Sequence, residues 1–205
     1  KLLKKRLNPG GIACIWVHTN MSPDSFKSII RSFSSEFAFV SMWESIAGDD
    51  YLLIGSGKKY GLSFEKIQQY LSNKTVGHDL HRIGINNVPD LLSLMIMSRK
   101  KLVEFSGSAP VHTDDNSLLE FNAPEYVYKD DRAVLVRQLT PFIELEPKFV
   151  SFSQTDAKVR EEVEKKLLQL QRSESQIEDI KDKAELERLL DQAVEEFNVG
   201  NISGA

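Results

Sequence analysis

Two adjacent carboxylates, Asp114 and Asp115, lie in a polar segment together with His112 and Thr113. Neighbouring carboxylates are suited to bind an ammonium group at the rim of a cleft, because charge-assisted hydrogen bonds are strong. The other interpretation is an ordinary polar turn, in which an aspartate caps the element that follows. We therefore take Asp114 and Asp115 as candidate substrate-binding residues, with the turn as the alternative.

A second candidate pair, Trp16 and His18, stands at the end of the apolar segment IACIWV. Side chains two residues apart on a strand point to the same side. Ligands of open α/β sheets bind beyond the carboxyl ends of the strands, so Trp16 is either a pocket wall or part of the core. His18 is suited to acid–base chemistry, although a lone histidine without a partner is more often structural. No residue is assigned a catalytic role, which stays unknown.

The sequence argues against metal and nucleotide-loop chemistry. Cys14 and the four histidines show no standard ligand spacing, and His78 and His81 lack a third ligand nearby. Neither a glycine loop ending in Lys-Ser/Thr nor a G-x-S-x-G elbow is present. Two glycines, Gly55 and Gly57, follow the last predicted strand instead of opening a strand-to-helix crossover. We interpret them as part of a loop.

Composition limits the class of protein. The chain has 205 residues, of which 41% are hydrophobic, so it can bury a core. A net charge of −4 gives no sign of nucleic-acid binding, and no apolar run approaches the roughly 18 residues of a membrane span. The single Cys14 cannot form an internal disulfide, which fits a reducing compartment, and we expect a cytoplasmic protein. The opening KLLKKRLNPGG, without an initiator methionine, predicts a chain cut from a longer one.

The elements that position these residues begin with LNPGGIACIW, Leu7 to Trp16, which predicts a helix end, a tight turn and a strand. The continuously apolar segment 12–17 is typical of a strand buried on both faces, as in a parallel sheet. Ser22-Pro23-Asp24 then predicts a helix start. The apolar face of this helix has helical spacing; it comprises Phe26, Ile29, Ile30, Phe33 and Phe37.

A predicted hairpin follows, with strands over Phe39–Ile46 and Tyr51–Gly55 and with Asp49 and Asp50 at its tip. A short turn makes the two strands antiparallel neighbours. The strand–helix–strand unit before it is typical of a parallel crossover. The predicted fold class is therefore α/β.

Further helices are predicted along the rest of the chain. They cover 63–71, 89–97, 99–105, 131–139, 154–172 and 174–198, with polar, less regular segments over 73–87 and 107–122. Glycine is absent from about residue 154 until Gly200, proline does not appear again, and charged residues become dense. We therefore divide the chain into an α/β domain over 1–150 and a helical appendage over 151–205.

Three segments taken together resemble the carboxy-terminal half of spermidine synthase-like proteins, in particular bacterial forms fused to other segments. They are LNPGGIACIW, FVSMWESIAGDDYLLIGS and SAPVHTDDNSLLEFNAP. The resemblance covers roughly residues 1–125. It implies the doubly wound, Rossmann-like fold of class I S-adenosylmethionine-dependent methyltransferases, whose sheet is parallel except for one antiparallel strand from a late hairpin. This chain would be the distal half of that sheet, followed by a helical segment.

The resemblance also implies what this chain lacks. Segment 7–16 corresponds to the fifth strand of the family, and the first four strands would lie upstream. The glycine-rich cofactor turn and the catalytic acid of the family belong to that upstream part. We therefore expect this chain alone to be inactive and to bind no cofactor, while the full parent uses decarboxylated S-adenosylmethionine or S-adenosylmethionine. Trp16 stands where the synthases commonly carry a glutamine, which puts spermidine synthesis in doubt.

The last residues, LLDQAVEEFNVGNISGA, resemble the first helix and turn of a tetratricopeptide repeat. The alternative is an ordinary amphipathic helix that ends at Gly200. Either helix could bind a protein partner. The fifth strand would expose an apolar edge, so we also expect pairing with the upstream half of the same protein or self-association. Two other functions stay open: a degenerate methyltransferase-like scaffold, and methyl transfer to another acceptor.

Overall fold

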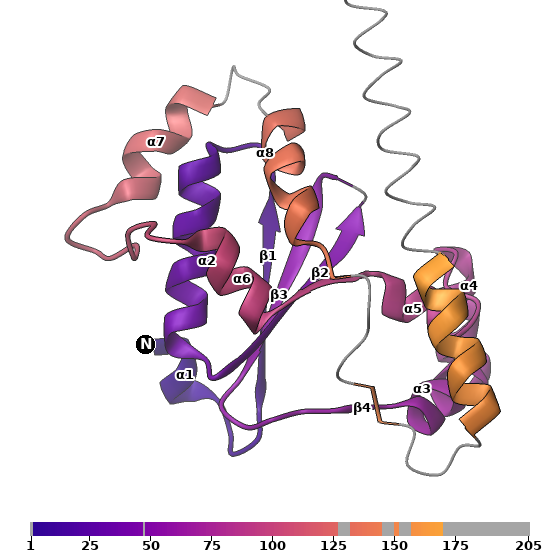
Figure 1. The fold of residues 1–205 in the computed structure, drawn as a ribbon. Coiled ribbons are helices and arrows are strands. Elements are labelled where there is room, and N and C mark those ends of the chain that lie inside the picture. The colour runs from indigo at the N-terminus through magenta and orange to yellow at the C-terminus, as the bar shows by residue number, and fades with distance from the viewer. Residues whose placement is uncertain (1, 47, 127–131, 145–149, 152–156, 170–205) are drawn as a thin grey trace, which may run out of the picture.

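The computed structural model describes residues 2–46, 48–126, 132–144, 150–151 and 157–169. Its main sheet has the strand order β1-β3-β2-β5, and every neighbouring pair is antiparallel (Figure 1). The bounds are β1 (Ile12–His18), β2 (Phe39–Ile46), β3 (Asp50–Ser56) and β5 (Met95–Ser98). Because β1 and β2 are both antiparallel to β3, they run in the same direction with β3 inserted between them.

Helix α2 (Pro23–Glu36) covers one face of this sheet, and α6 (Arg99–Ser106) packs beside it (Figure 1). The predicted helix start is confirmed: Ser22 is the N-cap, and its Oγ accepts a hydrogen bond from the Ser25 backbone N–H at 3.0 Å. Pro23 occupies the first turn, where a missing N–H costs nothing. The helix therefore begins where the sequence predicts.

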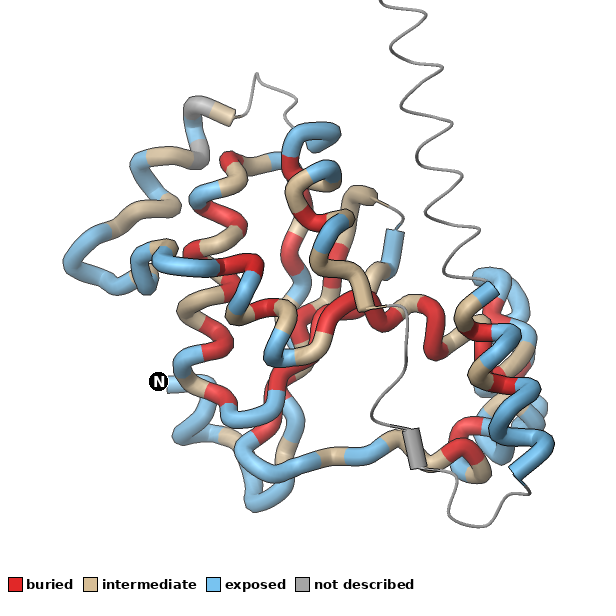
Figure 2. The backbone as a smooth tube through the Cα atoms, in the orientation of Figure 1, coloured by how far each residue is buried: buried red, intermediate tan, exposed pale blue. Residues whose placement is uncertain are grey.

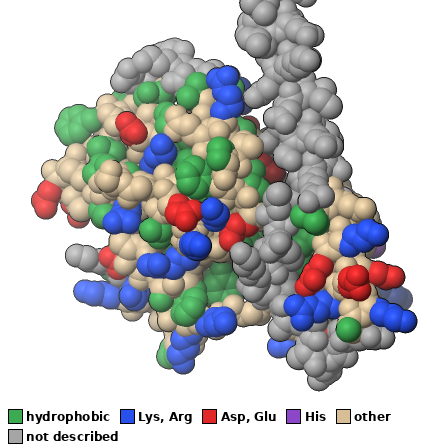
Figure 3. Space-filling view, in the orientation of Figure 1, with side chains coloured by type: hydrophobic (Ala, Val, Ile, Leu, Met, Phe, Trp, Pro, Cys, Tyr) green, Lys and Arg blue, Asp and Glu red, His purple; other side chains and the backbone are tan. Residues whose placement is uncertain are grey.

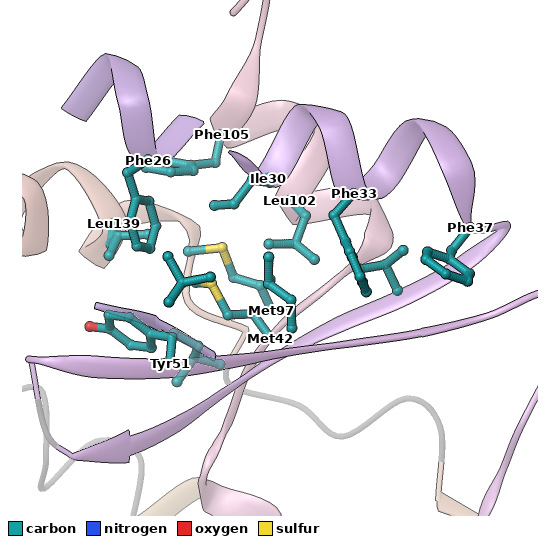
Figure 4. Packing of buried hydrophobic residues seen from close by; sticks show 14 of the residues in the cluster. Phe26, Ile30, Phe33, Phe37, Met42, Tyr51, Met97, Leu102, Phe105 and Leu139 are labelled. Atoms are coloured by element: carbon teal, nitrogen blue, oxygen red, sulfur yellow. The ribbon is translucent and has the colours of Figure 1, made fainter. Parts of the chain in front are cut away.

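The main core lies between these helices and the sheet. Figure 4 shows Phe26, Ile30 and Phe33 of α2 pointing toward Met42 and Tyr51 of the strands. The approach is close over β3, because a Cβ added at Gly55 would lie 2.7 Å from the Phe33 ring. Glycine at this position lets the helix settle onto the sheet.

A second apolar cluster covers the opposite face of the sheet, over β2 and β5. It combines Trp43 and Met95 with α3 (Phe64–Leu71), α5 (Val88–Ser93) and a helix over 157–169. Val163 and Leu167 of that last helix are buried in the cluster. The first part of the charged carboxy-terminal region therefore packs on the α/β fold.

The remaining elements surround these two cores. They are α1 (Leu2–Arg6), α4 (Lys74–Arg82), α7 (Leu118–Tyr126), α8 (Arg132–Leu139) and the 3-10 helix Thr140–Phe142, with a small parallel pair formed by β4 (Leu62–Ser63) and β6 (Val150–Ser151). Leu135 and Leu139 of α8 are buried in the main core. This helix therefore lies on the same side of the sheet as α2 (Figure 1).

Several predicted elements are confirmed and others are wrong. The β2–β3 hairpin and the helices near 63–71, 99–105 and 131–139 are present. The predicted helix 89–97 is wrong in its second half, because Met95–Ser98 pairs with β2 as a strand. Two helices, Lys74–Arg82 and Leu118–Tyr126, replace segments that we predicted to be irregular. The second charged helix and the repeat-like tail lie outside the described residues.

The mixed α/β class is confirmed, but two expectations about its sheet are not. No neighbouring strands of the described main sheet are parallel, whereas we expected a doubly wound, mostly parallel arrangement. Strand β1 is buried on one face only: Ala13 and Val17 are buried, while Ile12 and Trp16 are exposed. An unbroken apolar run therefore did not mean burial on both faces.

Candidate functional site

Trp16 and His18 lie side by side near the carboxyl end of β1, as strand alternation predicts. Their ring centroids are 5.3 Å apart. Trp16 is 60% exposed, so it is not part of the core. The Nδ1 atom of His18 accepts a hydrogen bond from the Asn20 backbone N–H at 3.1 Å. This contact fixes the imidazole to the turn after the strand and favours the structural interpretation of His18.

Asp114 and Asp115 lie elsewhere, on a loop that packs against the outer side of α2. Ser28 Oγ donates to the Pro110 carbonyl at 2.7 Å, and the His112 backbone N–H donates to Ser32 Oγ at 2.8 Å. Ser28 is two residues after Phe26, about 200° around the helix from the face that meets the sheet. The helix therefore separates the two aspartates from β1.

The local bonding of this loop favours the turn interpretation of the aspartates. The backbone N–H groups of Asn116 and Ser117 both donate to the Thr113 carbonyl, at 3.2 and 3.1 Å. Both Asp114 and Asp115 are exposed. The structure thus brings Trp16 and His18 together but does not bring either of them to the aspartates.

The outer edge of β1 is the most distinctive feature near the candidate residues. The Thr19 backbone N–H donates to the Asp49 carbonyl at 2.9 Å. This bond shows which residues of β1 direct their N–H and C=O groups toward β3. Hydrogen-bonding directions alternate along an antiparallel ladder. The N–H and C=O groups of Ile12, Cys14 and Trp16 therefore point away from β3. In the described part of the chain no strand pairs with them.

This edge, which we call the β1 edge and define as residues 12–18, lacks the usual protection. Natural sheet edges carry charges, prolines or bulges that prevent pairing with another chain. The segment IACIWVH has none of these, and its pairing with β3 is regular throughout. Its exposed side chains are apolar or weakly polar, and buried and exposed residues alternate along it (Figure 2). The β1 edge can therefore accept a strand.

One acidic residue that carries no motif in the sequence lies near the same end of the sheet. Glu44 of β2 is half-buried, and its carboxylate accepts a hydrogen bond from the Gly48 backbone N–H at 2.7 Å. Burial raises the pKa of Glu44, while the Gly48 hydrogen bond opposes the shift. The sequence signal was a single charged residue inside the strand FVSMWESI, and this gave no indication of function.

Two features of the described residues bear on cofactor and metal binding. The connection from β1 to α2 is Thr19-Asn20-Met21-Ser22, without the glycine that close approach of a backbone to a phosphate or nucleoside requires. Within the described ranges no group of three or more His, Cys, Asp or Glu side chains could hold a metal ion. The β1–α2 connection therefore has no glycine-rich turn of the kind that holds a nucleotide cofactor.

Comparison with known proteins gives no match to a protein family, a curated protein or a solved structure. Among the helices that the structure describes, none has the length and apolar character needed to cross a membrane.

Proposed function

We propose that this chain is the distal part of a spermidine synthase-like α/β domain, and that its role in that domain is to complete the sheet. In this proposal the β1 edge receives a strand from the upstream part of the same protein. The parent would transfer an aminopropyl group from decarboxylated S-adenosylmethionine to a polyamine in the cytoplasm, and this chain would be inactive alone.

The observation that carries the proposal is the unprotected β1 edge. A strand with outward N–H and C=O groups and exposed Ile12 and Trp16 is an aggregation hazard unless another strand covers it. The strand order supports the same conclusion. The antiparallel β3 comes from the β2–β3 hairpin and lies between β1 and β2, which run in the same direction, and the family resemblance implies one antiparallel strand from a late hairpin.

Self-association of the chain tests whether the β1 edge accepts a strand. With no upstream strand present, we expect copies of the chain to pair through this edge as protein concentration rises. The substitution Trp16→Lys places a charge on the edge and should weaken this association about tenfold or more, because roughly 1.4 kcal/mol corresponds to a factor of ten. Light scattering coupled to size-exclusion chromatography measures the effect.

Ile83→Lys is the matched control for that experiment. Ile83 is 71% exposed and directly follows α4, so the substitution adds the same charge far from β1 in the sequence. Its association should equal that of the unmodified chain. A chain that stays monomeric at high concentration would contradict the proposal, and so would equal effects of the two substitutions.

A non-enzymatic scaffold is the second candidate function, and one observation favours it. The candidate substrate-binding residues are dispersed, with Asp114 and Asp115 held on the far side of α2 from Trp16. In this case the α/β fold would only position helices that bind a protein partner. A methyltransferase acting on another acceptor shares the fold but has no separate support.

A thermal-shift titration with S-adenosylmethionine, its decarboxylated form and methylthioadenosine tests whether this chain binds a cofactor, which neither candidate function expects. We expect no saturable rise in melting temperature, because the sequence carries no glycine-rich turn at a strand-to-helix crossover. A saturable rise would show a cofactor site within these 205 residues and would overturn the sheet-completing proposal. Repeating the titration with the upstream sequence attached distinguishes the enzyme, whose melting temperature should rise, from the scaffold.

A further inference from the structure

A cavity of about 180 Å³ opens at the end of the sheet opposite to Trp16 and His18. It lies between the first residues of β2, the start of α6 and the segment that follows β3. Its wall is mainly apolar and includes Phe39, Val40 and Met95. A dry apolar cavity of about 150 Å³ is large enough for benzene, so this one can hold a single ring or a short branched alkyl group.

Three cationic side chains also line this cavity: Lys59, Arg99 and Lys100. All three residues are exposed, and none forms a salt bridge with another described residue. Figure 3 shows Lys and Arg side chains on the face of the molecule over α6, with Asp and Glu side chains among them. An apolar wall with a cationic rim favours an amphiphilic anion.

Two described carboxylates near this cationic rim have hydrogen-bond partners outside it. Glu144 accepts a hydrogen bond from the Ser98 backbone N–H and so occupies the amino-terminal end of α6. Glu104 pairs with Lys101 at 2.8 Å, one residue beyond the rim. An incoming anion would therefore meet the side chains of Lys59, Arg99 and Lys100, and would not use the helix end.

A neutral donor completes the cavity. The Trp43 Nε1–H donates to Ser41 Oγ at 2.8 Å, and Ser41 Oγ lies 2.5 Å from the Tyr60 hydroxyl oxygen. Ser41 can pass its own hydrogen to that oxygen, which leaves the Tyr60 hydrogen for a ligand. Burial raises the pKa of Tyr60, so the hydroxyl stays protonated at neutral pH.

We propose that this cavity binds a small organic anion, namely a carboxylate or phosphate ester with one aromatic ring or a short branched alkyl group. The apolar body would lie against Phe39, Val40 and Met95, and the anionic group would face the three cations and Tyr60. This inference is independent of the proposed sheet-completing function, because it uses the opposite end of the sheet from Trp16.

Calorimetric titration of the whole chain with phenyl phosphate tests the proposal. We expect saturable binding that is about tenfold weaker in the double variant Arg99→Gln/Lys100→Gln, because two attractive charges are lost. Tyr60→Phe should weaken binding by a smaller factor and tests the hydroxyl without changing charge. Lys58→Gln is the matched control: Lys58 is exposed beside Lys59 but does not line the cavity, so binding should be unchanged.

Two further ligands separate the parts of the recognition. Benzylamine has the ring with the opposite charge, and inorganic phosphate has the anion without the ring; both should bind at least tenfold more weakly than phenyl phosphate. Absence of phenyl phosphate binding would overturn the proposal. The same holds if the double variant binds as well as the unmodified chain, or if either comparison ligand binds equally well.

Discussion

Replacing Phe26 with alanine is expected to destabilise the chain by about 3–5 kcal/mol, the usual cost of truncating a buried phenylalanine. The Phe26 side chain is fully buried in the main core. Its ring meets Tyr51 edge-on, with centroids 6.0 Å apart, and Phe105 in the same manner at 6.3 Å. The substitution would therefore leave a cavity where α2, α6 and β3 meet. Thermal unfolding should show a midpoint lower by roughly 6–20 °C for a chain of this size.

Phe121→Ala is the matched control, because it removes the same atoms from a side chain that is 79% exposed. Its free energy of unfolding should change by less than about 0.5 kcal/mol. Similar effects of the two substitutions would contradict the core described here. The experiment thus tests whether α2 is fixed on the sheet by its aromatic face.

Local signals in the sequence predicted α2 and the hairpin correctly, because the residues that define each of these elements lie within the element or next to it. Ser22 and Pro23 define a helix start through the geometry of the first turn, whatever lies around it. The short turn near Asp49 likewise forces β2 and β3 to pair. The helix start and the hairpin pairing depend on residues that are neighbours in the sequence, so both can be predicted without knowledge of the tertiary structure.

Strand β5 could not be predicted in the same way. The sequence LLSLMIMS has an apolar pattern that suits a buried helix or a buried strand equally. The segment forms a strand because Met95 and Met97 pair with residues of β2. The expectation that β1 is buried on both faces was wrong for a related reason. The sequence shows that Trp16 is apolar, but the arrangement of other elements determines whether anything covers its side chain.

The candidate site also depends on contacts between segments that are distant in the sequence, which local signals do not predict. Strand alternation correctly placed Trp16 next to His18, since both belong to one strand. Whether Asp114 lies near them depends on how a loop almost 100 residues later packs, and Ser28 and Ser32 of α2 hold that loop on the outer side. The cavity between β2 and α6 was missed because its residues come from three separated segments, none of which carries a recognisable motif.

Gly77→Ala is expected to destabilise the chain by about 1–3 kcal/mol, which reverses the usual effect of this substitution. In the interior of a helix alanine is normally favoured over glycine by about 1 kcal/mol. Gly77, however, is buried in α4 where this helix turns back against α3. A Cβ added there would lie 2.0 Å from the carbonyl oxygen of Leu71, the last residue of α3. Backbone atoms cannot move aside as a flexible side chain can, so the two helices would have to separate.

The comparison with Gly57→Ala isolates that steric cause. A Cβ added at Gly57 meets no atom within 4 Å, and this glycine does not have a positive φ. Thermal unfolding of the Gly57→Ala chain should therefore match the unmodified chain within about 0.5 kcal/mol. Hydrogen exchange should accelerate in α3 and α4 of the Gly77→Ala chain, because the α3–α4 contact is the one that opens. An unchanged or higher stability for Gly77→Ala would show that these helices do not pack as closely as Leu71 and Gly77 require.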